Sequence, residues 1–338
     1  MTKGKIFGQH MAAEIAESPA VFARAALADH RAALKGLGLS DARAFYTIAR
    51  GSSDAAANIV SYEMMRELGR PMTSLPPSIF SLGRGVDMSG AAALVISQSG
   101  ASDDLVRSAR GVRAAGGAVL AITNQPGSAV ESAAQVTLAI SAGAELAVPA
   151  TKTVIGSVAA GMALIAAMVP GYGHKVARSA AVFLHAAKGM HPKASDLCSA
   201  LLRAQHVYVI GRDTGFGAAQ EVALKLKECC ALHAEAYSSS EVLHGPLQLV
   251  TKPLLILMLD TEMAGANDSL DLAEARFRSA GGAVYRLRPS DVSAFGLLPS
   301  AAAALLLYLI YPVILAVSVA LGLDPDRPAT LSKVTQTT

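Results

Sequence analysis

Residues 92–115, AALVISQSGASDDLVRSARGVRAA, contain three successive sequence patterns. The segment 92–97 is a short apolar run with β-branched residues, which is typical of a buried strand. A loop rich in serine follows, and residues 105–115 predict a helix that ends at Gly116. A strand, a short loop and a helix in this order are typical of a parallel α/β sheet.

The same order of patterns recurs along the chain. Further strands are predicted at residues 44–50, 118–123, 136–140, 207–211, 253–259 and 283–287. An offset of 162 positions aligns Ile48 and Arg50 with Ile210 and Arg212, together with the helix that follows each pair. This weak internal repeat predicts two similar structural units in one chain.

We therefore predict an α/β protein with two tandem three-layer α/β/α units and mostly parallel, flavodoxin-like sheets. The expected parts are an N-terminal helical segment (1–35), a first unit (36–168), a helical linker (169–195), a second unit (196–323) and a C-terminal tail (324–338). A chain of 338 residues with 52% hydrophobic and 16% charged residues can fill two cores, so disorder is not expected.

Charge and cysteine content argue against several classes of protein. A net charge of +3 is too weak to predict a nucleic-acid partner or an anionic membrane surface. The three cysteines have no CxxC spacing and the N-terminus has no signal-peptide pattern, so we expect reduced thiols in the cytoplasm. Residues 154–170 and 297–323 are as apolar as membrane spans, but Pro312 interrupts the second and neither has a clear flanking Lys/Arg cluster, so no span is expected.

Two loops that follow predicted strands are rich in serine. One holds Gly51, Ser52 and Ser53, and the other runs from Ser97 to Ser102. Parallel sheets bind ligands at the carboxyl ends of their strands, where the next helix offers free N–H groups. Such loops could bind a phosphate monoester, or the serines could simply cap helices. No nucleotide is indicated, because the chain has neither GxxxxGK[ST] nor a dinucleotide-type GxGxxG.

The segment 221–250 combines acidic, basic and imidazole groups more densely than any other. On a helix, Glu221, Lys225 and Glu228 lie at i, i+4 and i+7 and share one face. By itself this spacing favours an amphipathic surface helix with a salt bridge. Likewise, a histidine such as His244 before Gly-Pro would ordinarily be a plain loop residue.

Several motifs together resemble the sugar isomerase (SIS) family. They are SQSG at 97–100, GAELAVPATK at 143–152, ALKLKE at 223–228, HAEAY at 233–237, HGPL at 244–247 and DPDRPATLSKVT at 324–335. The resemblance covers essentially the whole chain and is strongest to the isomerase half of glutamine–fructose-6-phosphate aminotransferase. It implies the fold predicted above and a phosphorylated sugar as ligand.

The resemblance also implies which residues hold the substrate. The residues implied for the sugar phosphate are Ser53, Ser97, Gln98, Ser99 and Ser102, with Gly51 and Ser52 in the first of the two loops. The backbone of Val148 would hold sugar hydroxyls.

Four further residues are implied in catalysis. Glu228 resembles the base that moves a proton between C1 and C2, and Lys225 on the same face could orient or tune it. His244 resembles a ring-opening acid/base that the neighbouring subunit contributes. Lys333 resembles a tail lysine that closes over the open-chain sugar and can form a Schiff base with it.

The implied reaction follows from the absence of a glutaminase segment in this sequence. Without glutamine-derived ammonia, we expect the isomerising deamination of glucosamine 6-phosphate to fructose 6-phosphate and ammonia. The expected protein is a homodimer with a shared active site and no cofactor, and its histidines show no metal-ligand spacing.

Alternative functions remain open at this point. They are a deglycase or isomerase acting on fructosamine 6-phosphate or galactosamine 6-phosphate, and a sugar-phosphate sensor without catalysis. Ala101 and Ala150 stand where the aminotransferase has polar residues, so the exact substrate is open.

Overall fold

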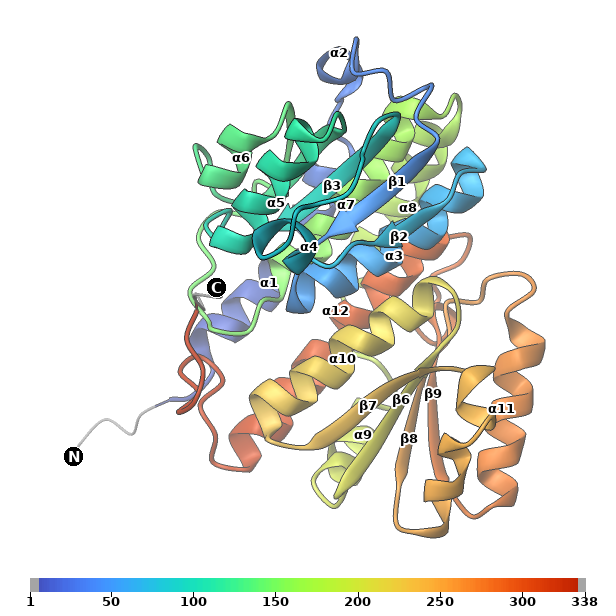
Figure 1. The fold of residues 1–338 in the computed structure, drawn as a ribbon. Coiled ribbons are helices and arrows are strands. Elements are labelled where there is room, and N and C mark those ends of the chain that lie inside the picture. Colours follow the sequence, from blue (N-terminus) through green and yellow to red (C-terminus); the bar gives the residue numbers. More distant parts are fainter. Residues whose placement is uncertain (1–5, 334–338) are drawn as a thin grey trace. The chain divides into compact units, whose positions relative to one another are not determined.

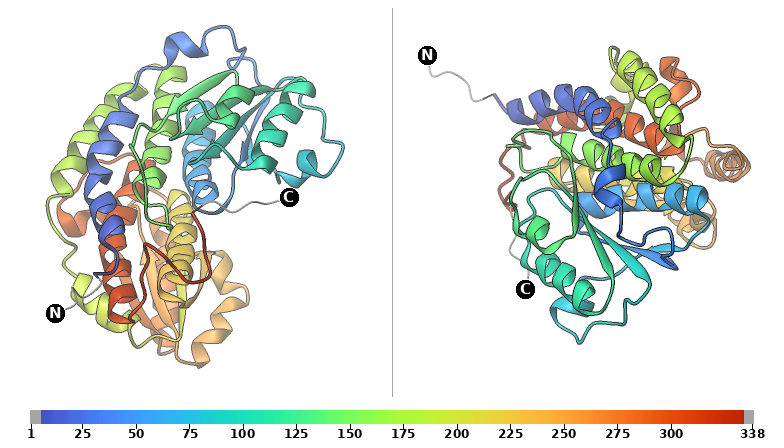
Figure 2. Two further views of the ribbon diagram at one scale, coloured as in Figure 1. Left: turned by 90° about the vertical axis from the view of Figure 1, so that its left-hand side faces the viewer. Right: turned by 90° about the horizontal axis from the view of Figure 1, so that it is seen from above.

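A computed structural model describes residues 6–333 of the chain (Figure 1 and Figure 2). The chain forms two compact units, each discontinuous in sequence. The five-stranded unit comprises Ala20–Gly143 and Thr153–Ala181. The four-stranded unit comprises residues 6–19, Ala144–Lys152 and Val182–Lys333.

The sheet of the five-stranded unit is parallel throughout, with the strand order β2-β1-β3-β4-β5. Its strands are β1 (Ala44–Ile48), β2 (Met72–Ser74), β3 (Ala91–Ser97), β4 (Ala118–Thr123) and β5 (Val136–Ala139). Its helices are α2 (Arg31–Leu34), α3 (Gly51–Leu68), α4 (Ser78–Ser81), α5 (Asp103–Ala114) and α6 (Ala129–Ala133). Three helices cross a boundary between the units: α1 (Gln9–Ala26), α7 (Lys152–Met168) and α8 (Tyr172–Ala186).

In the five-stranded unit, apolar strands form the core, and a glycine allows two helices to pack closely. Ile48, Val95 and Val119 on neighbouring strands share a buried core with α5. On α7, a Cβ atom at Gly161 would lie 2.4 Å from a methyl carbon of Val60 on α3, so only glycine permits this approach of the two helices.

The four-stranded unit repeats this topology. Its sheet is also parallel, with the order β7-β6-β8-β9. Its strands are β6 (His206–Gly211), β7 (His233–Ser238), β8 (Leu255–Leu259) and β9 (Ala283–Leu287). Its helices are α9 (Ala194–Leu201), α10 (Thr214–Cys230), α11 (Asn267–Ser279) and α12 (Pro299–Ala320), with 3-10 segments η1 (Glu241–Leu243), η2 (Pro246–Thr251) and η3 (Pro289–Val292).

Two layers of helices enclose the four-stranded sheet. Alternate residues such as Tyr208, Ile210 and Ile256 pack with Phe277 of α11 on one face. Because side chains alternate along a strand, the intervening residues face the other side, where α10 contacts β6, β7 and β8. The predicted α/β fold of two parallel-sheet units is therefore confirmed.

The strand prediction misses β2 and β7. Each lies at the edge of its sheet, and β7 alternates little in burial. Edge strands need not be apolar on both faces, so neither segment has the continuous apolar run that identifies β3.

The apolar segment near the C-terminus forms α12. Within residues 6–333 it is the one helix that is long and apolar enough to cross a membrane, and 72% of its most apolar window is buried inside the protein. It packs against α9 and α10 of its own unit, with Pro312 inside the helix. Burial in this core accounts for its composition.

Candidate functional site

The charged face of α10 is buried rather than solvated. The Lys225 ammonium lies 2.5 Å from Glu228 Oε2 and 3.4 Å from Glu221 Oε1. The side chains of Glu221 and Lys225 are 0% and 1% exposed, whereas that of Glu228 is 27% exposed. The surface-helix alternative is therefore wrong, and Glu228 is the member of this set that a substrate could reach.

The buried lysine is a permanent cation. Burial lowers the pKa of Lys225, but the charges of Glu221 and Glu228 raise it by more, so the net pKa lies above the ordinary value. Lys225 therefore stays protonated and cannot act as a base at neutral pH. Its ammonium donates a hydrogen bond to Glu228 Oε2 and so holds that carboxylate in place.

Glu228 lines a cavity of about 490 Å³ in the four-stranded unit. One wall is the C-terminal end of α10, including Lys227, Glu228 and Cys229, and another is the chain segment from Gly322 to Leu331. This volume suits a small metabolite.

The tail lysine lies against the segment that contains Val148. The Lys333 ammonium donates to the Ala147 carbonyl at 2.6 Å and to Glu145 Oε2 at 3.1 Å. The N–H of Val148 donates to the Asp326 carbonyl at 3.4 Å. The four-stranded unit thus places Lys333 against the short loop that contains Val148.

Three acidic residues that sequence reasoning missed hold this arrangement together. Asp326 accepts hydrogen bonds from the N–H groups of His10 at 2.9 Å and Met11 at 2.8 Å. Glu14 on α1 accepts from the N–H groups of Leu146 and Ala147. Glu145 accepts from the N–H of Thr151, and all three acids are buried.

His244 lies apart from these groups in sequence and is exposed. It follows η1, and its N–H donates to the Glu241 carbonyl at 3.0 Å. Gly245, the next residue, has φ +140, a conformation that favours glycine. A role for His244 in the site of a neighbouring subunit stays a prediction.

The two serine loops lie at one edge of the five-stranded sheet. They follow β1 and β3, which are hydrogen-bonded neighbours. Ser53 lies in the first turn of α3, whose N-cap position is Arg50, so the helix-cap alternative fails for Ser53. Ser102 is at the N-cap position of α5 but makes no side-chain cap bond.

The serine loops have internal supports. The Ser97 hydroxyl accepts from the N–H of Gly100 at 3.1 Å, and the Ser99 hydroxyl accepts from Ala101 at 3.3 Å. A Cβ atom at Gly100, which has φ +60, would lie 2.1 Å from the Ser128 hydroxyl oxygen. Glycine is therefore needed at this turn.

An ion pair that the motifs did not reveal ties the two loops together. The Arg50 guanidinium donates to Oδ2 of the buried Asp104 at 2.8 and 2.9 Å. Arg50 precedes α3 and Asp104 lies in the first turn of α5. The pair therefore fixes the spacing of two helix N-termini, each of which offers N–H groups to an anion.

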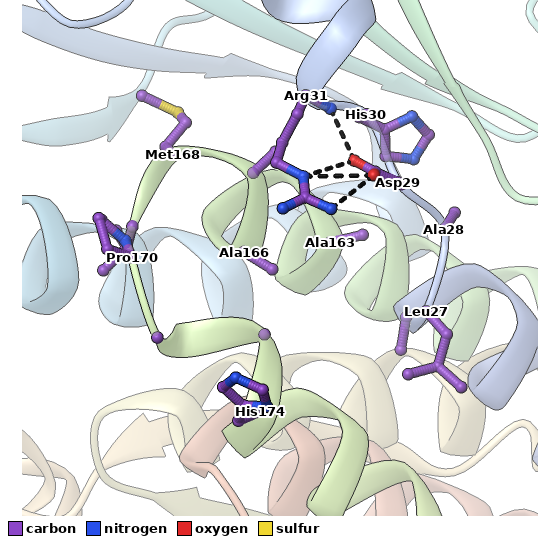
Figure 3. A pocket seen from close by; sticks show the side chains of 15 residues that line it. Leu27, Ala28, Asp29, His30, Arg31, Ala163, Ala166, Met168, Pro170 and His174 are labelled. Carbon is purple, nitrogen blue, oxygen red and sulfur yellow. Dashed lines mark hydrogen bonds and ion pairs between the residues drawn. The ribbon is translucent and has the colours of Figure 1, made fainter.

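A different cavity, which lies in the five-stranded unit, is lined by none of the predicted site residues. It measures about 510 Å³ and is lined by the ends of α1 and α7 and the start of α8 (Figure 3). Arg31 and Asp29 form an exposed ion pair beside it at 2.7 Å. We assign it no part in the chemistry.

Comparison with known proteins identifies the family. The SIS domain family matches residues 38–167 and 200–287. The isomerizing glutamine–fructose-6-phosphate aminotransferase of Aeropyrum pernix is 29% identical over 355 residues, covering 96% of this chain and 56% of that protein. This chain spans about half the length, or less, of the curated relatives it matches.

Solved structures agree with this assignment. A candidate phosphosugar isomerase from Silicibacter pomeroyi DSS-3 has a TM-score of 0.81 and 30% identity, covering 95% of this chain and 100% of that one. Glucosamine-6-phosphate deaminase from Thermotoga maritima shares the fold, with a TM-score of 0.73 at 19% identity, covering 97% and 100% of the two chains. The predicted resemblance is confirmed: the chain belongs to the SIS domain family.

Proposed function

We propose that this protein is a phosphosugar isomerase that deaminates an amino-sugar 6-phosphate, converting glucosamine 6-phosphate and water to fructose 6-phosphate and ammonia. The observation that carries the proposal is the Glu221–Lys225–Glu228 set. It presents one partly exposed carboxylate, backed by a buried cation, to a cavity of about 490 Å³.

Glu228 acts as the base in this proposal. In the open-chain sugar, the carbonyl at C1 acidifies the C2–H bond. Glu228 removes the C2 proton and a proton returns to C1. The amine loses one proton and the C1 oxygen gains one, so the C1 aldehyde becomes an alcohol and an imine is left at C2. Water then hydrolyses that imine, so one water is consumed for each ammonia released.

The phosphate group is assigned to the serine loops of the five-stranded unit. Hydroxyl and N–H donors at two helix N-termini can bind a phosphate by hydrogen bonds, without a lysine in the loop. The residues proposed for this role are Gly51, Ser52, Ser53, Ser97, Gln98, Ser99 and Ser102.

The remaining roles belong to residues away from α10. Lys333 closes over the open-chain sugar, where its amine can form a Schiff base with the carbonyl. The Val148 backbone binds sugar hydroxyls. His244 opens the ring of the sugar that is bound by a second subunit, so the proposed enzyme is a homodimer. Its proposed location is the cytoplasm.

The proposal is tested by incubating the protein with glucosamine 6-phosphate in the absence of glutamine. Fructose 6-phosphate and ammonia are expected in equal amounts, and Glu228→Gln should abolish turnover while retaining phosphosugar binding. Full activity in Glu228→Gln would refute the assignment of the base.

A substrate panel separates the alternatives. Turnover of galactosamine 6-phosphate or fructosamine 6-phosphate in place of glucosamine 6-phosphate would replace the substrate but keep the isomerase chemistry. Tight binding of the panel with no turnover would indicate a sugar-phosphate sensor instead.

A further inference from the structure

The turn that carries His244 is tied to strand β6 in the core of the four-stranded unit. Tyr208 lies on β6 and is 2% exposed, and its hydroxyl donates to the Pro246 carbonyl at 3.2 Å. Pro246 comes two positions after His244, so this hydrogen bond holds the turn on its C-terminal side. A buried residue of the sheet thus reaches the turn of an exposed residue that is predicted to take part in the chemistry.

A second contact from the end of the same strand holds the other side of the turn. Arg212 directly follows β6, and its guanidinium donates to the hydroxyls of Ser238 at 2.9 Å and Ser240 at 2.5 Å. Ser240 is at the N-cap position of η1, and His244 is at its C-cap position. The segment is therefore held before and after the exposed residues His244 and Gly245.

Apolar contacts do not by themselves fix the orientation of this turn. Leu243, Leu247 and Val250 pack against the core that contains Tyr208. Such contacts are not directional, and Gly245 between them has more backbone conformations open to it than other residues. A hydrogen bond to the carbonyl group that follows Gly245 is directional, so it selects one orientation of the peptide.

We propose that Tyr208 is a positioning residue for His244: its hydrogen bond to Pro246 holds the turn in the orientation that ring opening needs. This inference rests on the proposed function, in which His244 opens the sugar ring. Burial raises the pKa of Tyr208 to about 12, with Tyr237 and Glu235 adding to the effect, so the phenol remains a donor at neutral pH. The proposal gives a role to β6, a strand that contributes no residue to the predicted site.

The test is Tyr208→Phe, which removes one oxygen and keeps the ring. The matched control is Tyr237→Phe. The rings of Tyr237 and Tyr208 have centroids 4.9 Å apart, but the Tyr237 hydroxyl donates to Glu235 Oε2 at 2.9 Å instead of to the turn. Amide hydrogen exchange in residues 243–250 should be roughly two- to tenfold faster in Tyr208→Phe, as expected for one lost hydrogen bond, and unchanged in Tyr237→Phe.

A pair of sugars shows whether the anchored turn serves ring opening. In D₂O with ammonium, the reverse of the proposed reaction exchanges a C1 hydrogen of fructose 6-phosphate, which is mainly a closed ring. The 5-deoxy analogue of this sugar lacks the hydroxyl that closes the ring. Tyr208→Phe should slow exchange with fructose 6-phosphate by roughly three- to tenfold and leave exchange with the analogue unchanged. A merely structural loss would lower both rates equally.

The variant His244→Gln tests whether Tyr208 acts through His244. It should show the same selective loss, and adding Tyr208→Phe should cause little further loss, because both changes affect one step. Unchanged amide exchange in Tyr208→Phe, equal losses with both sugars, an additive loss in the double variant, or the same changes in Tyr237→Phe would overturn the proposal.

Failure of the proposed function would look different. Wild-type protein that exchanges hydrogen in neither sugar would reject the proposed reaction. Faster amide exchange of the turn in Tyr208→Phe, but not in Tyr237→Phe, would still support the anchoring of the turn by Tyr208, because that measurement needs no turnover.

Discussion

At the scale of single residues, Lys225 is a buried cation whose side chain is 1% exposed between two carboxylates. We predict that Lys225→Met destabilises the protein by about 3–5 kcal/mol, because it leaves Glu221 without its buried cation. Denaturant unfolding measures this loss. Lys227→Met, on the exposed face of the same helix, is the control and should change little. Equal losses in the two variants would contradict the buried role.

A second residue-scale prediction concerns Glu14. Burial raises its pKa above the ordinary value of 4.5, and Glu145 adds to the effect, although N–H groups of Leu146 and Ala147 oppose it. The native state therefore binds the proton more tightly than the unfolded state, and the stability present below pH 4.5 is lost as pH rises through the raised pKa.

Glu14→Gln has no such proton to lose. Its free energy of unfolding relative to wild type should therefore improve as pH rises above 4.5, measured by urea unfolding between pH 4.5 and 7. A difference that stays constant over this range would show that Glu14 titrates alike in both states.

Sequence reasoning identified the shared face of α10 but not its surroundings. The i, i+4, i+7 spacing places Glu221, Lys225 and Glu228 together wherever that face points. Whether it faces solvent is decided by α12, whose Tyr311 donates a hydrogen bond to Glu221 from 90 positions away. Periodicity within one helix contains no information about such a distant partner. The same holds for the Asp326 carboxylate, which accepts hydrogen bonds from His10 and Met11 at the other end of the chain.

At the scale of elements, the approach of α7 to α3 gives a sharp test. Gly161→Ala would place a Cβ atom 2.4 Å from Val60, so we predict a loss of about 1–3 kcal/mol from overpacking. Gly173→Ala on α8 is the matched control, because its Cβ would find its nearest atom 3.9 Å away. Thermal unfolding should show a lower Tm for the first variant and an equal or higher Tm for the second.

The elements that were predicted share one property: their local pattern is strong. Strand β3 is a buried apolar run next to a turn, and α12 is continuously apolar. The edge strand β7 combines His233, Glu235 and Ser238 with small residues, and pairing with β6 rather than hydrophobicity makes it a strand. Tertiary pairing of this kind lies outside the reach of a local pattern.

At the scale of the whole molecule, ligand binding should raise stability. A ligand that binds the native state at about 100 times its Kd adds about 2.7 kcal/mol. Glucosamine 6-phosphate should therefore raise the Tm of wild type and of Glu228→Gln alike. Glucosamine without phosphate should not, and the double variant Ser53→Ala, Ser99→Ala should lose most of the shift. An equal shift with unphosphorylated glucosamine would argue against the serine loops as phosphate site.

The hydrogen bonds of Asp326 also bear on the order in which the molecule can be completed during its synthesis. They join residues 315 and 316 positions apart, from the first turn of α1 to the segment that leads to Lys333. A growing chain therefore carries an uncapped first turn of α1 until nearly all of the described residues have left the ribosome. The contact between Lys333 and the loop of Val148 depends on that same late segment, so the proposed chemistry is available only to a chain that has been made through to its tail.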